Sequence, residues 1–230
     1  QVKRLSELGR GIVIRLTEIA FPYAEPIARA VSEFTDGRQT LFILDFQKQN
    51  RDLLLKSLSV ITIANALQRI LPDCIVSASA STFPSTFVGL SNQEIYERQL
   101  YNEIVRHIGE ENTIYCDRAS VRAESQDGGG QPAPRIDNAV MTRWEFFREP
   151  DEEDKYEAYQ KAAERAIDST NWADLGIWGT EFIKRTKSGA DDSIDTAQKA
   201  TAARINIHLY IQSRPDTPQD TLGGEDLWED

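Results

Sequence analysis

The feature that most constrains the fold is a strand–loop–helix–strand stretch over residues 74–120. It contains an apolar run (CIVSASA), a polar loop (STFPSTFVGLSNQ), an amphipathic segment (EIYERQLYNEIVRHIG) and a second apolar run (TIYCDRAS). A crossover of helical length joins parallel neighbours, so the stretch predicts a parallel β-α-β unit. In such folds ligands bind at the carboxyl edge of the strands, and this loop would lie there.

The same alternation extends along the whole chain. Strands are predicted over residues 11–18, 39–46, 140–148 and 204–212, the last because four isoleucine and leucine residues alternate with polar ones. Helices separate them, and a seventh strand near Ile177 is an open alternative. The best fit is an α/β fold with a TIM-barrel-like parallel barrel, N-terminally incomplete because one or two strands are lacking.

The chain is expected to form a single barrel-like domain over residues 1–214, followed by an acidic tail. Beyond Arg214 the sequence holds acidic residues and no basic one, which predicts a disordered tail over residues 215–230. Residues 124–138 hold three consecutive glycines and predict a mobile loop. Since the chain opens at Gln1 on what resembles the tail of a helix, we expect an N-terminal portion to precede it.

Charge and cysteine usage narrow the class of protein. The net charge of −11 disfavours a general nucleic-acid or anionic-membrane surface but leaves room for a local basic cleft. Cys74 and Cys116 fall in predicted strands and are interpreted as reduced residues, because nothing near them has metal-ligand spacing. No signal peptide or unbroken apolar run of membrane-spanning length is present, so a cytoplasmic location is predicted.

Polar side chains recur at the carboxyl ends of the predicted strands. They are Arg15, Glu18, Asp45, Ser77, Ser79, Ser81, Asp117, Arg118, Arg143, Glu145, His208 and Tyr210. In a parallel barrel these ends converge on one mouth, so Arg15, Asp45, Asp117 and Arg143 are predicted to share a polar cleft.

This residue mixture supports two kinds of chemistry. Arginines clamp phosphate or carboxylate groups by paired hydrogen bonds, whereas paired carboxylates hold a divalent metal or act as acid and base. A structural network of salt bridges is the simpler interpretation of the same residues. His208 is equally consistent with an inward packing role and a functional one.

Four stretches together resemble one known family. They are RGIVIRLTE with TLFILDF, then SASTFPSTFVGLSNQEIYERQLYNEI, then TIYCDRASV, and finally LGIWGTEFIK with ARINIHLYIQ. In this order they are similar to the beta protein family of phages and bacteria, whose members are longer, so the chain would correspond to their C-terminal two-thirds. The resemblance implies an association with phages, mobile elements and antiviral defence.

The resemblance also points to individual residues. The family's sequence motif after the third strand is matched by Phe83, Pro84 and Arg98. Where that motif has an acidic and an aromatic residue, this chain has Gln99 and Leu100. Asp117, Trp178 and Gly179 match as well, and a closing histidine pair is reduced to His208.

Two functions remain open. In the first, the barrel mouth binds a phosphorylated or nucleic-acid-derived ligand, or a protein partner, through Arg15, Ser79, Phe83, Arg98, Arg143, Trp178 and His208. In the second, Asp45, Asp117 and Glu18 form the catalytic group of a phosphodiesterase or nuclease that uses a divalent metal cofactor. We expect a protein partner or a homo-oligomer, with nucleic acid or nucleotide as an alternative and no membrane.

Overall fold

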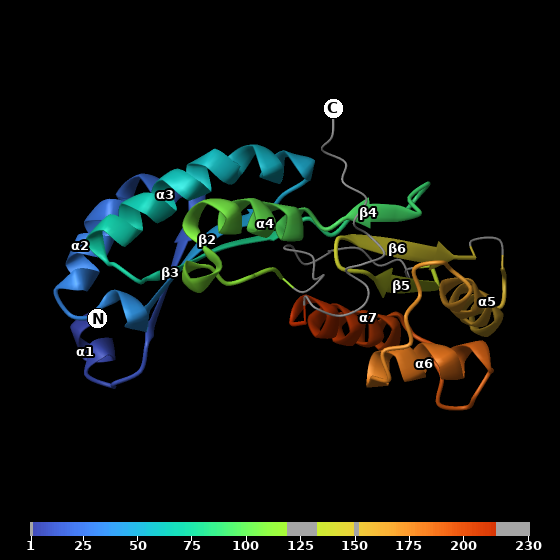
Figure 1. Ribbon diagram of the computed structural model, residues 1–230. Coiled ribbons are helices and arrows are strands. Elements are labelled where there is room, and N and C mark those ends of the chain that lie inside the picture. The colour runs from blue at the N-terminus through green and yellow to red at the C-terminus, as the bar shows by residue number, and fades with distance from the viewer. Residues whose placement is uncertain (1, 119–132, 150–151, 215–230) are drawn as a thin grey trace. The chain divides into compact units, whose positions relative to one another are not determined.

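The computed structural model describes residues 2–118, 133–149 and 152–214, which divide into two compact units (Figure 1). Unit 1 comprises Gln1–Phe83 and Tyr96–Glu124, and unit 2 comprises Pro84–Ile95 and Ser125–Asp230. The chain therefore leaves unit 1 after its third strand, contributes one short strand to unit 2, and returns.

Unit 1 is built on a three-stranded parallel sheet in the order β1-β2-β3. The strands are β1 (Ile12–Thr17), β2 (Thr40–Lys48) and β3 (Ile75–Ser81). All three were predicted, because each is a short apolar run bounded by polar or turn-forming residues. Thr113 adds an isolated parallel bridge to Val76, and the predicted fourth strand is reduced to this bridge among the described residues.

Four α-helices and four short 3₁₀ segments complete unit 1. They are α1 (Val2–Ser6), η1 (Glu18–Tyr23), α2 (Ala24–Ser32), η2 (Gly37–Gln39), η3 (Arg51–Lys56), α3 (Ser57–Ile70), α4 (Tyr96–Ile108) and η4 (Glu110–Asn112). Asn50 caps η3 by accepting a hydrogen bond from the Asp52 amide. Helix α2 buries Ala24, Ala28 and Val31, whereas Phe34 beyond its end is exposed.

The two faces of this sheet differ in character. Side chains at even positions on the strands, such as Leu44 and Val76, pack against α2, α3 and α4, which lie on one side of the sheet (Figure 1). Successive side chains on a strand point to opposite faces. The opposite face therefore carries Arg15, Asp45 and Ser79. This amphipathic sheet places charged residues away from the helical layer.

Unit 2 contains a three-stranded antiparallel sheet in the order β4-β6-β5, together with three helices. Its elements are β4 (Asn92–Glu94), β5 (Arg135–Ala139), β6 (Arg143–Arg148), α5 (Lys155–Ile167), α6 (Trp178–Lys187) and α7 (Ala197–Gln212). Asp154 caps α5 by accepting hydrogen bonds from the amides of Tyr156 and Glu157.

The prediction of a TIM-barrel-like parallel barrel is wrong. The described strands form one open parallel sheet and one antiparallel sheet, and neither closes into a barrel. The chain contains both helices and strands, but the expectation that helical crossovers join parallel strands holds only for β1, β2 and β3. Beyond them, β5 and β6 are adjacent in sequence and pair as antiparallel neighbours through a short connection, which needs no helix.

The strand predicted over residues 204–212 is part of helix α7. Its buried residues Ala203, Ile207 and Ile211 recur every four positions, whereas Leu209 is exposed. Residues that alternate with a period of two also recur every four positions, so the same apolar pattern fits one face of a helix. No glycine or proline interrupts the segment after Ala197. The continuous helix therefore satisfies its backbone without a neighbouring strand. Residues near Ile177 likewise form no strand, and α6 begins at Trp178.

Two further expectations need correction or lie outside the described residues. The predicted loop 124–138 overlaps strand β5, whose residues from Arg135 onward pair with β6. The rest of that loop up to residue 132, and the tail over residues 215–230, lie outside the described residues.

One helical stretch in the described part of the chain, Arg51–Ile70, has the length and apolar composition that a membrane-crossing helix would need. Val60, Ala64 and Leu67 in this stretch are fully buried against the sheet of unit 1. One such stretch is not sufficient to indicate a membrane span.

The turn between α2 and β2 depends on the absence of a side chain at Gly37. A Cβ atom at this position would lie 1.6 Å from the carbonyl oxygen of Pro72, which is backbone and cannot move aside cheaply. Gly37→Ala should therefore lower the free energy of unfolding by about 1–3 kcal/mol or more. Chemical denaturation measures this, with the exposed Glu33→Ala variant as the control; equal midpoints for Gly37→Ala and the parent would contradict the packing described.

Candidate functional site

Asp45 is the centre of a charged cluster at the carboxyl end of β2. Its side chain is 2% exposed, although it is a carboxylate. Arg15, on β1, forms an ion pair with its Oδ2 atom, and Arg118 donates from Nη2 to the same oxygen at 2.9 Å. Two guanidinium groups from separate segments therefore meet at one buried carboxylate.

Asp45 stays ionised in this environment. Burial alone would raise its pKa, but the Gln47 amide, Arg15 and Arg118 outweigh that effect and hold the pKa below its ordinary value. The Gln47 amide donates to Oδ1 at 2.8 Å, and Gln47 itself has a left-handed backbone with φ of 59°. A non-glycine residue in this conformation is uncommon and marks a locally strained bulge beside Asp45.

Hydroxyl side chains continue the same face of the sheet. Ser79 on β3 lies opposite Asp45 on β2. Two residues earlier on β3, Ser77 lies opposite Ile43, and Ile43 lies opposite Arg15 on β1. Both serines are buried. Among the described residues, the Ser77 hydroxyl is enclosed and makes no hydrogen bond. A buried hydroxyl without a partner is unusual and needs an explanation.

Glu97 forms a second buried carboxylate in unit 1. It lies in the first turn of α4 and accepts hydrogen bonds from the amide and hydroxyl of Thr82, at 2.5 Å and 2.6 Å. Burial raises its pKa more than these two hydrogen bonds lower it, and the nearby Asp117 carboxylate raises it further. Glu97 therefore fixes the chain where it leaves β3.

Arg98 and Tyr115 connect this carboxylate to Asp117. The Arg98 guanidinium lies 4.0 Å from the centre of the Tyr115 ring, and the Tyr115 hydroxyl donates to Asp117 Oδ2 at 2.6 Å. Burial raises the pKa of Tyr115 well above its ordinary value, and Asp117 adds to the effect. Tyr115 therefore acts as a neutral hydrogen-bond donor.

The predicted catalytic residues have different surroundings. Asp45 belongs to the cluster with Arg15 and Arg118, and Asp117 belongs to the group with Tyr115. Glu18, by contrast, accepts hydrogen bonds from Lys56 at 3.0 Å and from Gln49 at 3.4 Å. It lies at the start of η1, and its ion-pair partner is Lys56.

The predicted ligand-binding residues are divided between the two units. Arg15, Ser79 and Arg98 lie in the sheet or α4 of unit 1, and Phe83 is buried at the end of its first segment. Arg143, Trp178 and His208 belong to unit 2.

The three residues in unit 2 have local packing partners. His208 is buried on α7 and stacks on the Trp144 ring with centroids 4.6 Å apart. Trp178 begins α6, is about half exposed, and packs against Phe182. Arg143 lies 3.6 Å from the Glu145 carboxylate. The placement of His208 agrees with the packing alternative given for it from the sequence.

Glu97, Thr82 and Tyr115 were not predicted as site residues. A signal for Glu97 is present, because it lies three, seven and eleven positions before Leu100, Ile104 and Ile108, the buried residues of α4. A carboxylate in line with an apolar helical face predicts a buried charge. Nothing in the local sequence of Tyr115 distinguishes it from an ordinary strand residue.

The described residues hold no group of three histidine, cysteine, aspartate or glutamate side chains placed to bind a metal ion. Asp45 is bonded to two arginines and Glu18 to a lysine. Oxygen ligands that already neutralise cations are poor ligands for a divalent metal. The arrangement is better suited to holding arginine side chains in fixed positions.

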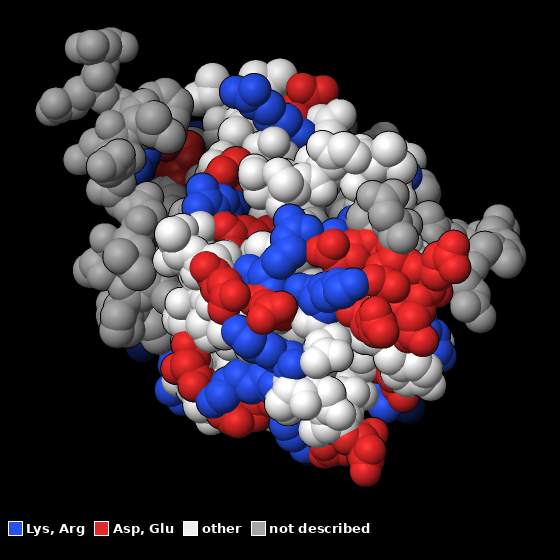
Figure 2. All heavy atoms as spheres, turned by 90° about the vertical axis from the view of Figure 1, so that its right-hand side faces the viewer, with Lys and Arg blue, Asp and Glu red and all other residues white. Residues whose placement is uncertain are grey.

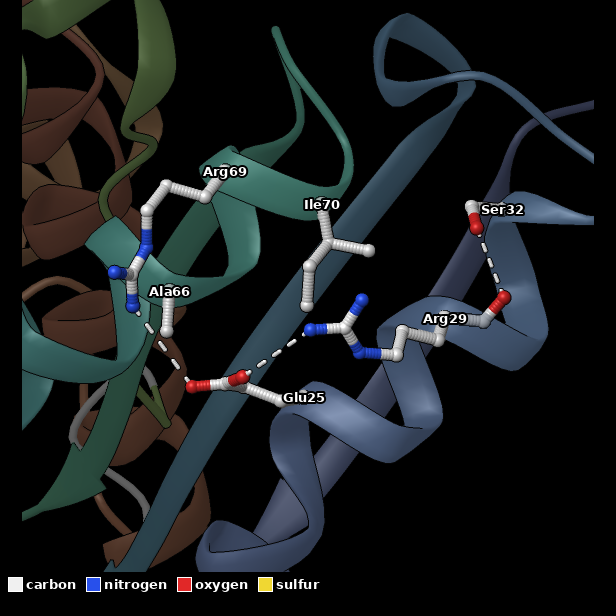
Figure 3. A pocket seen from close by; sticks show the side chains of 6 residues that line it. All are labelled: Glu25, Arg29, Ser32, Ala66, Arg69 and Ile70. Carbon is white, nitrogen blue, oxygen red and sulfur yellow. Dashed lines mark hydrogen bonds and ion pairs between the residues drawn. The ribbon is translucent and has the colours of Figure 1, made fainter.

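A groove on the helical side of unit 1 is a competing anion site. It encloses about 590 Å³ between α2 and α3 and is lined by Glu25, Arg29, Ser32, Ala66, Arg69 and Ile70 (Figure 3). Glu25 lies 3.8 Å from both Arg29 and Arg69, whose side chains are 70% and 75% exposed. Charges exposed to this degree are screened by salt, so this groove is the weaker candidate.

Unit 2 presents mixed charge on the side that carries α5 and α6. Figure 2 shows basic and acidic side chains interspersed over this face. Ion pairs such as Arg165 with Glu149 and Lys187 with Asp168 account for this pattern. A surface of alternating charge provides no continuous basic patch for a polyanion.

Comparisons with known proteins place the chain in one family. A family model described as Beta protein matches residues 1–214. Protein beta of Enterobacteria phage P4 is 25% identical over 222 residues, which cover 92% of this chain and 61% of that protein. The chain thus spans less than two thirds of the length of this relative. No solved structure matched the chain. The predicted correspondence to the C-terminal two-thirds stays a prediction.

The raised pKa of Glu97 predicts how the free energy of unfolding depends on pH. A carboxyl group that binds its proton more tightly when folded stabilises the protein below its ordinary pKa of 4.5, and this contribution is lost as pH rises through the raised value. Relative to Glu97→Gln, the parent should lose about 1.4 kcal/mol over this window for each pKa unit of increase. Denaturation of both proteins across this pH range measures it, and parallel stability profiles would contradict it.

Proposed function

The chain belongs to the Beta protein family, and from this premise we propose that it is a phage- or mobile-element-associated protein that binds a phosphorylated or nucleic-acid-derived ligand at the Asp45 cluster. Support for the association is its similarity to Protein beta of Enterobacteria phage P4. The defence-type role implied by the resemblance stays a prediction.

The observation that carries the ligand class is the pair of arginines held by Asp45. Arg15 is 56% exposed and Arg118 is 29% exposed, while the carboxylate that orients them is buried. Guanidinium groups carry five N–H donors each and favour planar, paired bonds to phosphate oxygens. A buried carboxylate reduces their freedom before a ligand arrives, so less entropy is lost on binding.

The overall charge supports a local rather than an extended site. With a net charge of −11, the protein repels a long polyanion over most of its surface. Two oriented arginines are sufficient to bind one anionic group through charge-assisted hydrogen bonds. A nucleotide or a single phosphate group of a nucleic acid meets this requirement.

Removal of either arginine should weaken ligand binding. Arg118→Ala and Arg15→Ala should each raise the Kd for nucleotide probes by about tenfold or more, since a charged hydrogen bond contributes about 1.5–3 kcal/mol. Isothermal titration with nucleoside monophosphates and short oligonucleotides measures this. Arg69→Ala is the matched control, because this arginine also faces a carboxylate but lies in the exposed groove of unit 1. If Arg69→Ala weakens binding and Arg118→Ala does not, the groove is the site.

The second candidate function is a metal-dependent phosphodiesterase or nuclease. It is favoured only by the presence of two carboxylates, Asp45 and Asp117, in unit 1. The ion pairs of Asp45 and Glu18 weigh against it. Bound metal stabilises a folded protein by mass action. We expect millimolar Mn²⁺ to leave the melting temperature of the parent protein unchanged. A rise that Asp45→Asn and Asp117→Asn both abolish would favour the enzyme instead.

A further inference from the structure

Strand β1 is an open edge of the sheet in unit 1. In the order β1-β2-β3 it pairs only with β2 among the described residues, whereas β3 also carries the parallel bridge between Val76 and Thr113. Alternate residues of an edge strand direct their N–H and C=O groups away from the sheet. Such a row of backbone groups is a template on which a further strand can pair.

This edge lacks the features by which edge strands discourage pairing. Strand β1 has the sequence IVIRLT, without proline or lysine, and its register with β2 is continuous, without a bulge. The apolar side chain of Val13 is 60% exposed. Arg15 is the one charged residue of the strand, and its guanidinium group is paired with Asp45 on β2. The charge that could protect the edge is therefore engaged within the sheet.

We propose that β1 pairs with β1 of a second copy of this chain, as antiparallel neighbours about a two-fold axis perpendicular to the sheet. Opposite side chains in an antiparallel pair point to the same face of the sheet. A symmetric pairing therefore places one residue of β1 opposite itself. Near the middle of the strand this residue is Val13, Ile14 or Arg15.

The charges that flank β1 select one of these three registers. With Ile14 opposite itself, Arg10 of each copy lies opposite Glu18 of the other, so two opposite-charge pairs form. Arg10 is exposed, and the Glu18 side chain is 43% exposed. With Arg15 opposite itself, two like charges meet, which is destabilising. With Val13 opposite itself, neither Arg10 nor Glu18 meets an opposite charge. The edge is thus complementary to itself in charge when Ile14 is central.

Reversal of one charge tests this register. The full chain should sediment as a concentration-dependent dimer in analytical ultracentrifugation. Arg10→Glu should raise the dimer Kd by about tenfold or more, because two attractive pairs become two repulsive ones. Arg4→Glu is the matched control, since Arg4 is an exposed residue of α1 that changes the net charge equally and lies outside the paired strands. It should leave the Kd unchanged.

Two further measurements tie the dimer to β1. Addition of Glu18→Arg to the Arg10→Glu variant restores opposite charges and should recover the parent Kd. Amide hydrogen exchange of the parent should show protection of β1 that increases with protein concentration. A monomeric parent protein, or a dimer whose Kd Arg10→Glu leaves unchanged, would overturn the proposal. Protection of the outward amides of β1 at every concentration would also overturn it, because the edge would then already be covered within one chain.

Discussion

The site in unit 1 depends on a single buried ion network, in which Asp45 holds Arg15 and Arg118. A carboxylate with 2% exposure cannot remain charged without compensation. Removing one partner of a buried ion pair is therefore strongly destabilising, because it leaves an uncompensated charge in the interior. The network joins β1, β2 and the segment after Thr113, which the sheet itself connects only by one bridge. The position of Arg118 is therefore set by this charge more than by backbone pairing.

The sheet of unit 1 was predictable because its strands are short apolar runs separated by helices of clear period. The antiparallel sheet of unit 2 was predicted only in part, since β6 lies within the strand predicted over residues 140–148. Strand β5 was missed because it contains only two apolar residues, Ile136 and Ala139, and is held by pairing with β6 and by ion pairs such as Asp137 with Arg204. Helix α7 was mistaken for a strand because a four-residue apolar spacing is contained in period-two alternation. A tertiary partner, and not the pattern, decides between the two.

The same distinction governs the site residues. The strand-end rule, which depends on parallel topology, selected Arg15, Asp45 and Arg118, and these three residues are in contact. It fails for Arg143 and His208, because their elements are an antiparallel strand and a helix of unit 2. Glu97 required attention to a charge in the apolar face of α4. Ordinary strand-end reasoning passes over helical residues, even where they hold the strand exit through Thr82.

The bulge after Asp45 shows how the site and the fold constrain each other. Gln47 is held at φ of 59° in a strand that is otherwise regular, a conformation that costs about 1–3 kcal/mol for a residue with a side chain. Its amide donates to Asp45, and the Gln49 amide donates to the Ser81 carbonyl oxygen, so both ends of the bulge are fixed. The carboxylate that orients two arginines therefore also offsets the strain of the bulge that shifts the register between β2 and β3. Replacement of Asp45 by an apolar residue would release the arginines and the bulge together, whereas asparagine retains an acceptor for the Gln47 amide and removes only the charge.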